Sequence, residues 1–205
     1  MSTVTLPVPD LDFQDERHVY FHRGYQIPSV TQVMEPMSLM LYAGVPSDVL
    51  ADAAGRGTAV HLQISNYIKF GVEETDEETE PYFNAYRKFA EDFQPVWLES
   101  EYRTHHKLMN YAGTLDLVGF VTPDDGNGVD VVDIKTTAQY HGVMLTTQVS
   151  AYAEALKSWD VPVRNRYGLQ LMKNGKYRLE KLEDGFMTFM QCFYIWQAMK
   201  SEKRP

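Results

Sequence analysis

The sequence predicts an α/β protein in which helices flank a central mixed sheet. Two observations predict this fold class. Apolar residues recur at helical spacing in the first half of the chain and again near residues 145–158, whereas residues 97–135 alternate with a period of two. Helices, three strands, a helix and two more strands then follow one another, as in a sheet covered by helices. Neither internal repeats nor a linker divides the 205 residues, so we expect one domain.

The N-terminal region, about residues 1–56, is expected to open with two short strands that turn at Gly24. A helix then begins, where Ser29 and Gln32 have the spacing of a capping box. A separate short helix is expected after Pro46.

The core, about residues 57–182, is expected to begin within a helix over 55–70 that Gly71 ends. The acidic run EETDEETE, residues 73–80, predicts a solvated loop because blocks of like charge seldom pack. A helix over 81–93 follows it. Strands are expected in an antiparallel meander over 97–104, 114–121 and 129–135.

The last part of the core is predicted to contain a helix over 145–158 and a hairpin of two strands, 167–172 and 177–182, around Asn174 and Gly175. A C-terminal amphipathic helix over about 185–200 completes the domain. Its apolar face would carry Phe186, Phe189, Phe193 and Trp196.

Composition narrows the classes of function. The sequence has no apolar run of about 18 residues that could span a bilayer and no start typical of a signal peptide, so we expect a cytoplasmic protein without a membrane partner. One cysteine, Cys192, excludes an internal disulfide framework. The net charge of −9 argues against a broad basic surface that coats DNA. A nucleic-acid contact would be local, and its candidate basic residues are Lys135, Arg103, Lys107, Arg164, Arg166 and Lys173.

The segment VVDIKT places Asp133 and Lys135 on one face of a strand. If the preceding hairpin aligns its faces, Asp116 joins them at one end of the sheet. Carboxylate oxygens are the ligands that Mg²⁺ and Mn²⁺ prefer, and a lysine beside such a metal can stabilise charge on a phosphoryl oxygen. The competing interpretation is an ordinary ion pair between Lys135 and an aspartate, which for an isolated pattern of this kind is the commoner case.

Three further features favour a site over an ion pair. Gly113 permits close backbone approach just before Asp116. His61 lies at the edge of an apolar helix face, where an imidazole is either a satisfied core residue or a metal ligand. Gln148 and Tyr152 lie four residues apart on one helical face after the strand.

Five segments in this order, IPSVTQVM, RGTAVH, YAGTLDLVG, VVDIKT and QVSAY, resemble the PD-(D/E)xK nuclease superfamily, in particular its RecB-like, phage-type exonuclease branch, which includes the mitochondrial genome maintenance exonuclease. The resemblance implies a restriction-endonuclease-like core. It also implies roles for individual residues. His61, Asp116, Asp133 and the Ile134 carbonyl would bind the metal, and Lys135 would be the catalytic lysine.

The same resemblance implies that Gln148 and Tyr152 support the site and contact DNA, and that Glu99 or Glu101 fills a further acidic position, with the two left undistinguished. Some relatives hold an iron–sulfur cluster through four cysteines, which a chain with Cys192 alone cannot provide. The expected cofactor is therefore Mg²⁺ or Mn²⁺ without an iron–sulfur cluster.

The resulting hypothesis is a metal-dependent deoxyribonuclease, an exonuclease that acts on linear DNA, single strands included, in phage or bacterial recombination, repair or DNA processing. A recombination or single-strand-binding protein is an expected partner, and the cytoplasm of a bacterial host cell is the expected location. One alternative is a catalytically silent nuclease-fold protein that binds nucleic acid or inhibits another machine. Another is a carboxylate metalloenzyme that does not act on nucleic acid, although Lys135, Gln148 and Tyr152 would then have no role.

Overall fold

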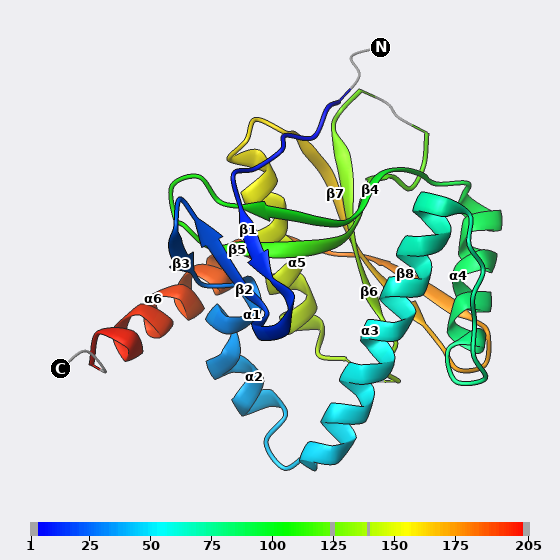
Figure 1. Ribbon diagram of the computed structural model, residues 1–205, viewed down its shortest axis with the longest axis horizontal. Helices are drawn as coiled ribbons and strands as arrows, with labels where there is room; N and C mark the ends of the chain where they lie inside the picture. Colours follow the sequence, from blue (N-terminus) through cyan, green and yellow to red (C-terminus); the bar gives the residue numbers. More distant parts are fainter. Residues whose placement is uncertain (1–3, 124–125, 139, 203–205) are drawn as a thin grey trace.

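The computed structural model describes residues 4–123, 126–138 and 140–202. It confirms the predicted α/β class: a mixed central sheet lies between two layers of helices (Figure 1). The sheet has five strands in the order β4-β5-β6-β7-β8. Their bounds are β4 Val96–His105, β5 Ala112–Phe120, β6 Val129–Lys135, β7 Val163–Leu171 and β8 Tyr177–Lys181.

The sheet is mixed because one of its neighbouring pairs is parallel. The strands β4, β5 and β6 form the predicted antiparallel meander, and β7 and β8 form the predicted hairpin. Between these two units, β6 and β7 run parallel. A parallel pair needs a long crossover, which the helix α5 (Gly142–Lys157) provides.

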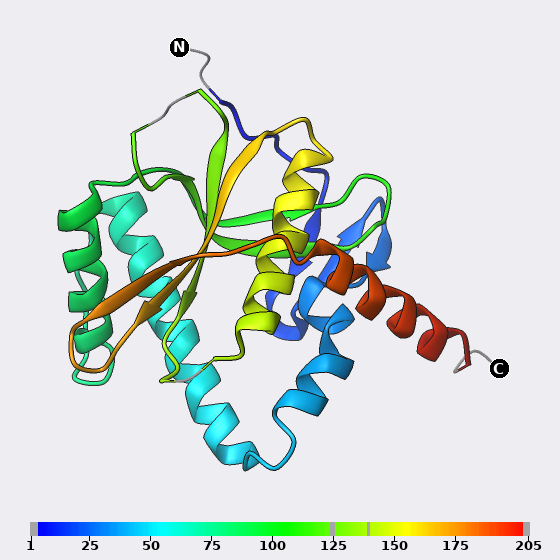
Figure 2. The same ribbon diagram turned by 180° about the vertical axis from the view of Figure 1, so that it is seen from behind.

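Helices cover both faces of the sheet. On one face, α3 (Ser47–Phe70) and α4 (Glu80–Phe93) bury an apolar cluster against the strands. On the other face, α5 packs with α1 (Val30–Val33) and α6 (Phe186–Glu202), the predicted C-terminal helix, as Figure 2 shows from behind. Each face of β6 therefore lies in a core, which explains its nearly continuous apolar sequence.

The prediction of two separate helices between residues 46 and 70 was wrong, because α3 is one helix of 24 residues. Gly55 lies in its interior, where a glycine costs about 1 kcal/mol relative to alanine. Val60 and Ile64 are fully buried, and burial of such side chains stabilises by about 1.5–3 kcal/mol each. The stabilisation from burying Val60 and Ile64 against the sheet thus exceeds the cost of Gly55, where the sequence suggested that one helix ends and another begins.

The N-terminal region forms a small three-stranded antiparallel sheet. The two predicted strands are present as β2 (Val19–His22) and β3 (Tyr25–Ile27), and the sequence did not predict the edge strand β1 (Asp12–Gln14) or the short 3-10 helix η1 (Asp15–Arg17) that follows it. The predicted capping box opens α1: the Ser29 hydroxyl accepts a hydrogen bond from the Gln32 amide at 3.0 Å, and the Gln32 side chain accepts one from the Ser29 amide at 3.0 Å. The helix α2 (Glu35–Leu41) follows directly.

The acidic segment 73–80 is exposed at seven of its eight positions, in line with the predicted loop. Thr79 is its buried exception, and the carboxylate of Asp76 accepts hydrogen bonds from the Thr79 amide at 2.7 Å and the Thr79 hydroxyl at 2.9 Å. These bonds form a turn that leads into α4. Within the described part of the chain, no helix is both long and apolar enough to cross a membrane.

Candidate active site

Acidic side chains lie in one row across the strands β4, β5 and β6. Leu117 on β5 pairs with Val132 on β6. Continuing this antiparallel register by one residue places Asp116 opposite Asp133. The pairs that flank residue 101 on β4 place Glu101 opposite Asp116 in the same way. Three carboxyl groups from three adjacent strands thus converge at one place on the sheet, two of them at the positions that the sequence predicted.

His61 extends this row from the helix α3. Its Nδ1 atom lies 3.3 Å from Oδ1 of Asp116 and 4.0 Å from Oε1 of Glu101. Its Nε2 atom lies 3.1 Å from the carbonyl oxygen of Ile134. One ligand atom each from His61, Glu101 and Asp116 lies within 4.8 Å of the other two, so these three residues could hold one metal ion.

The backbone of β6 holds Asp116 in this orientation. Its Oδ2 atom accepts a hydrogen bond from the Ile134 amide at 2.6 Å, which leaves Oδ1 facing His61. Ile134 therefore contributes two backbone groups to the site, an amide that fixes Asp116 and a carbonyl beside His61.

Lys135 lies on the other side of the row. Its Nζ atom is 2.6 Å from Oδ2 of Asp133 and donates a hydrogen bond of 3.3 Å to Oε1 of Gln148. The Gln148 amide in turn donates to the hydroxyl of Tyr152 at 3.1 Å. The predicted pair on α5 thus braces the lysine through a continuous chain of contacts.

Gly113 makes room for this brace. A Cβ atom on residue 113 would overlap the ring of Tyr152, which is buried against the strand. Only a residue without a side chain lets the α5 tyrosine approach β5 so closely. The glycine that precedes Asp116 in the sequence is therefore explained by packing of the site.

Burial and mutual repulsion keep the carboxyl groups of Glu101 and Asp133 ready to take up protons. Burial, followed by the charge of Asp116, raises the pKa of Glu101 to about 7. Burial likewise raises the pKa of Asp133 to about 6, although Lys135 opposes this effect. Asp116 behaves differently: burial alone would raise its pKa, but the adjacent His61 lowers it below the ordinary value.

The two basic groups stay charged for the complementary reason. Burial alone would lower the pKa of His61, but Asp116 outweighs it and raises the value to about 9. For Lys135, burial is likewise opposed by Asp133, and its pKa lies above the ordinary value. Clustered groups with strongly shifted pKa values are typical of functional sites.

The donors fit a divalent cation. Oδ2 of Asp133 is buried and, although it lies close to Lys135, accepts no well-directed hydrogen bond from the described residues. The Lys135 ammonium, 2.6 Å away, compensates this charge only in part, since burial still raises the pKa of Asp133; a further cation would stabilise the charged carboxylate. Carboxylates, a backbone carbonyl and one imidazole are suitable ligands for Mg²⁺ or Mn²⁺. Asp133 lies outside the group of three defined above but is next to it in the row.

Glu101 and Glu99 are now distinguished in position. Glu101 lies in the row, whereas Glu99 is exposed and outside the group of ligand atoms. Glu101 has a left-handed backbone, with φ of 52°, in the middle of a strand, where a side chain other than glycine is strained. Sequence alternation gave no means of choosing, because residues two apart in a regular strand share a face.

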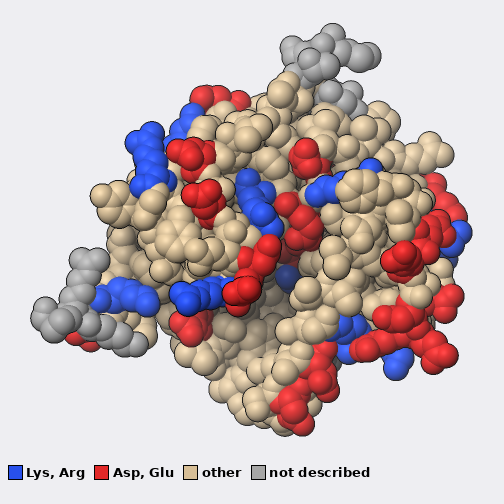
Figure 3. Space-filling view, viewed as in Figure 1, with Lys and Arg blue, Asp and Glu red and all other residues tan. Residues whose placement is uncertain are grey.

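Most of the basic residues proposed for a local DNA contact are engaged in ion pairs elsewhere. Arg103 pairs with Asp15 at 3.3 Å, Lys107 with Asp160 at 3.7 Å, and Arg166 with Asp184 at 3.5 Å. Arg164 binds the buried carboxylate of Asp130 at the opposite end of β6 from Lys135. On the face shown in Figure 3, acidic side chains gather beside α4 and the segment that leads into it, and Lys and Arg side chains are visible on other parts of the same face.

No protein-family model matches this sequence, and no curated protein matches it. Solved structures do match the fold. A candidate exonuclease from Eubacterium rectale is 9% identical over 72% of this chain and 65% of its own, with a TM-score of 0.48. The alkaline exonuclease of Laribacter hongkongensis is 9% identical over 85% of this chain and 86% of its own, with a TM-score of 0.45. Its complex with dAMP gives 10% identity over 86% and 89% of the two chains, also with a TM-score of 0.45.

These solved structures, with TM-scores of 0.48, 0.45 and 0.45, are what the chain is similar to. At these identities and TM-scores the similarity says nothing of the chemistry, which depends on the residues of this site.

Proposed function

We propose that the chain is a metal-dependent deoxyribonuclease that hydrolyses phosphodiester bonds from DNA ends. The observation that carries this proposal is the joint position of the carboxylate row, His61 and Lys135. A structural ion pair would need only Asp133 and Lys135. It would not need a second and a third carboxyl group beside them, since like charges held together destabilise a fold.

In this proposal, one set of residues binds the metal ion and Lys135 acts on the reacting groups. His61, Glu101, Asp116, Asp133 and the Ile134 carbonyl would hold Mg²⁺ or Mn²⁺. When bound, such an ion neutralises charge on a phosphoryl oxygen and lowers the pKa of a coordinated water. Lys135, kept as an ammonium by Asp133, can donate hydrogen bonds to the attacking water or to the charge that develops on the phosphate.

Gln148 and Tyr152 hold this lysine in place. Tyr152 is buried, and burial raises its pKa well above the ordinary value, so its hydroxyl stays protonated and acts as a hydrogen-bonding group. We expect the pair to keep the Lys135 ammonium directed at the bound phosphate. An activity of this kind would serve recombination, repair or DNA processing in a phage or a bacterial cell.

One assay separates this proposal from its alternatives. End-labelled linear DNA and closed circular DNA, each as single and double strands, are incubated with the purified protein in Mg²⁺ or in chelator. We expect loss of the linear substrates in Mg²⁺ only, with the circles resistant. Equal rates on circles and linear DNA would indicate an endonuclease. Binding of DNA without cleavage in Mg²⁺ would favour the catalytically silent alternative.

A further inference from the structure

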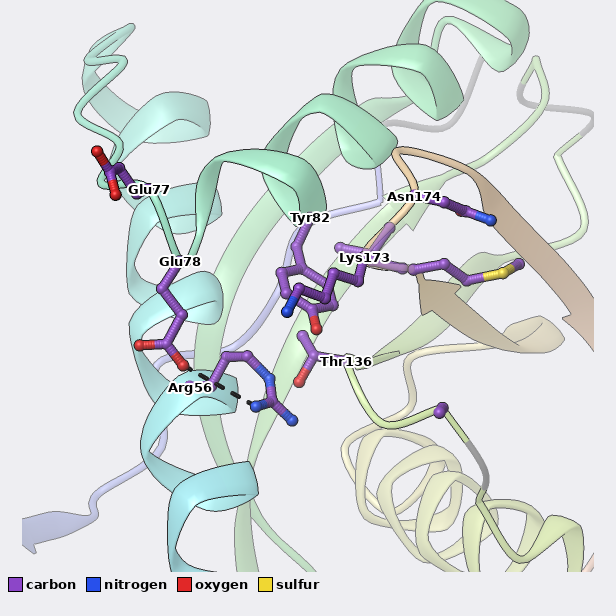
Figure 4. A pocket seen from close by; sticks show the side chains of 10 residues that line it. Arg56, Glu77, Glu78, Tyr82, Thr136, Lys173 and Asn174 are labelled. Atoms are coloured by element: carbon purple, nitrogen blue, oxygen red, sulfur yellow. Dashed lines mark ion pairs between the residues drawn. The ribbon is translucent and has the colours of Figure 1, made fainter. Parts of the chain in front are cut away.

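A pocket of about 770 Å³ lies beside the candidate site, at the carboxyl end of β6. It opens between α3, the start of α4 and the turn that joins β7 to β8 (Figure 4). Thr136, which follows Lys135 directly, lies in its wall. Its charged lining consists of two cations, Arg56 and Lys173, and two carboxylates, Glu77 and Glu78.

Arg56 is the main charged group of this pocket. Its Nε atom is buried and has no hydrogen-bond partner among the described residues, which is costly for a charged donor. Its guanidinium lies 5.7 Å from the ring centroid of the buried Tyr82, so the aromatic ring holds it in place. The side chain is 23% exposed and therefore within reach of a ligand in the pocket.

The acidic partner of Arg56 is a weak one. Nη1 of Arg56 lies 3.9 Å from Oε1 of Glu78, and the Glu78 side chain is 69% exposed. Ion pairs of this kind contribute little, because water screens them and a long side chain must be ordered. Glu78 belongs to the acidic segment 73–80, and in Figure 4 its carboxylate points at the guanidinium from the rim of the pocket.

Lys173 faces the pocket from the opposite wall, on the turn after β7. It is exposed, and no ion pair is found for it in the described part of the chain. Arg56 on α3 and Lys173 on the turn after β7 line the pocket together with the Thr136 hydroxyl. These donors suit a ligand that is negatively charged and has only hydrogen-bond acceptors. A phosphate has both properties.

We propose that this pocket binds a backbone phosphate of single-stranded DNA, through Arg56 and Lys173, and that Glu78 competes for Arg56 when DNA is absent. This inference rests on the nuclease function proposed above. Arg56 lies five residues before His61 on α3, or roughly 7.5 Å along the helix, which is on the order of two nucleotides of a stacked strand. The bound phosphate would thus lie about two nucleotides from the cleaved one. The pocket volume suits a small ligand or one nucleotide rather than a duplex.

The test measures binding apart from catalysis. A fluorescently labelled oligothymidylate is titrated with protein in chelator, and anisotropy is followed over a series of salt concentrations. We expect Arg56→Gln to weaken binding by about tenfold and to lower the log–log salt slope by about 0.7, the value for one phosphate contact on a single strand. Lys173→Gln should act in the same direction. Glu78→Gln should tighten binding by up to about fivefold, because it removes the competing anion.

A matched pair of controls is available on α4 and in the acidic segment 73–80. Arg87 on α4 pairs with Glu73 of the acidic segment at 3.6 Å, and both lie outside the pocket lining. Arg87→Gln and Glu73→Gln change the net charge as the test variants do and should alter binding by less than twofold. Circular dichroism checks that each variant is folded. If Arg56→Gln does not fold, DNA binding by the variants at the exposed positions Lys173 and Glu78 tests the proposal instead.

The outcomes separate the two proposals. If the wild type binds and cleaves DNA but the pocket variants behave like their controls, or the salt slope is unchanged, the phosphate pocket is wrong and the nuclease proposal stands. If the wild type neither binds nor cleaves any DNA, both proposals are wrong.

Discussion

Nδ1 of His61 lies 3.3 Å from Oδ1 of Asp116, and this contact joins the helix α3 to the strand β5 at the candidate site. The imidazole and the carboxylate either form an ion pair or share a metal ion. In the second case, His61→Ala should weaken Mn²⁺ binding by at least about tenfold, since loss even of a group that only supports a ligand has an effect of this size. Calorimetric titration of Mn²⁺ measures it. Unchanged Mn²⁺ affinity in a folded variant would show that His61 is not a ligand.

The stability of the metal-free protein should fall as the pH rises from about 5 to 9. The pKa of His61 is raised from 6.5 to about 9. The stabilisation of the fold by the charged imidazole is therefore complete below pH 6.5 and is lost as the pH approaches 9. The pKa values of Glu101 and Asp133 are raised to about 7 and about 6, so the folded state holds these protons more tightly and loses stability as they leave.

Mn²⁺ should reverse this trend, because it binds the deprotonated forms. Thermal unfolding in chelator and in Mn²⁺, measured between pH 5 and 9, should show that the metal raises Tm more at high pH than at low pH. A metal effect that is the same across the range would contradict the proposed ligands.

Gly113 and Gly55 predict opposite responses to the same substitution. Gly113→Ala places a methyl group in the ring of Tyr152 and should destabilise the protein by about 1–3 kcal/mol. Gly55→Ala adds a methyl group in open space within α3 and should stabilise by about 0.5–1 kcal/mol. Urea unfolding measures both. Gly113→Ala protein as stable as the wild type would show that the tyrosine does not pack on β5 as described.

Two aspartates on β6, three residues apart, should differ in role. Asp130 is fully buried and accepts hydrogen bonds from Arg164 at 2.9 Å, Asn165 at 2.8 Å and the Val121 amide at 2.8 Å. Asp130→Ala would remove the buried carboxylate that accepts these hydrogen bonds and would leave the buried Val121 amide without this acceptor, so it should cost about 3–5 kcal/mol of unfolding free energy.

Asp133→Asn should instead weaken Mn²⁺ binding and change stability less than Asp130→Ala does, because burial and the nearby Asp116 raise the pKa of Asp133 and so already disfavour its charged form. Urea unfolding and Mn²⁺ titration of both variants test the difference. An Asp130 variant as stable as the wild type would contradict the structural role assigned to that residue.

Much of the site could be predicted because it depends on local pattern. Strand alternation places Asp133 and Lys135 on one face, and a short hairpin register brings Asp116 beside them. Helical spacing likewise places Gln148 and Tyr152 together. These relationships follow from the period of each element and need no knowledge of the tertiary fold.

The remaining features depend on tertiary packing, which sequence patterns do not report. The left-handed backbone of Glu101 singles it out from Glu99, and nothing in the segment LESEYR signals it. Arg56 was missed as a candidate binding residue because only the approach of α3 to Thr136 gives it a pocket. Strand β1 has three residues, too few for an alternation to be recognised.

The most direct test of the proposed chemistry is single-turnover cleavage of linear DNA by Lys135→Ala, with Mn²⁺ titration of the same protein. The lysine ammonium, 2.6 Å from Asp133, is proposed to stabilise the reacting groups and not to bind the metal. Its loss should slow cleavage by at least about a hundredfold, or about 2.7 kcal/mol, while Mn²⁺ affinity stays the same or rises slightly as a nearby positive charge is removed. Unchanged cleavage by folded Lys135→Ala protein would contradict the assignment of nuclease chemistry to this site.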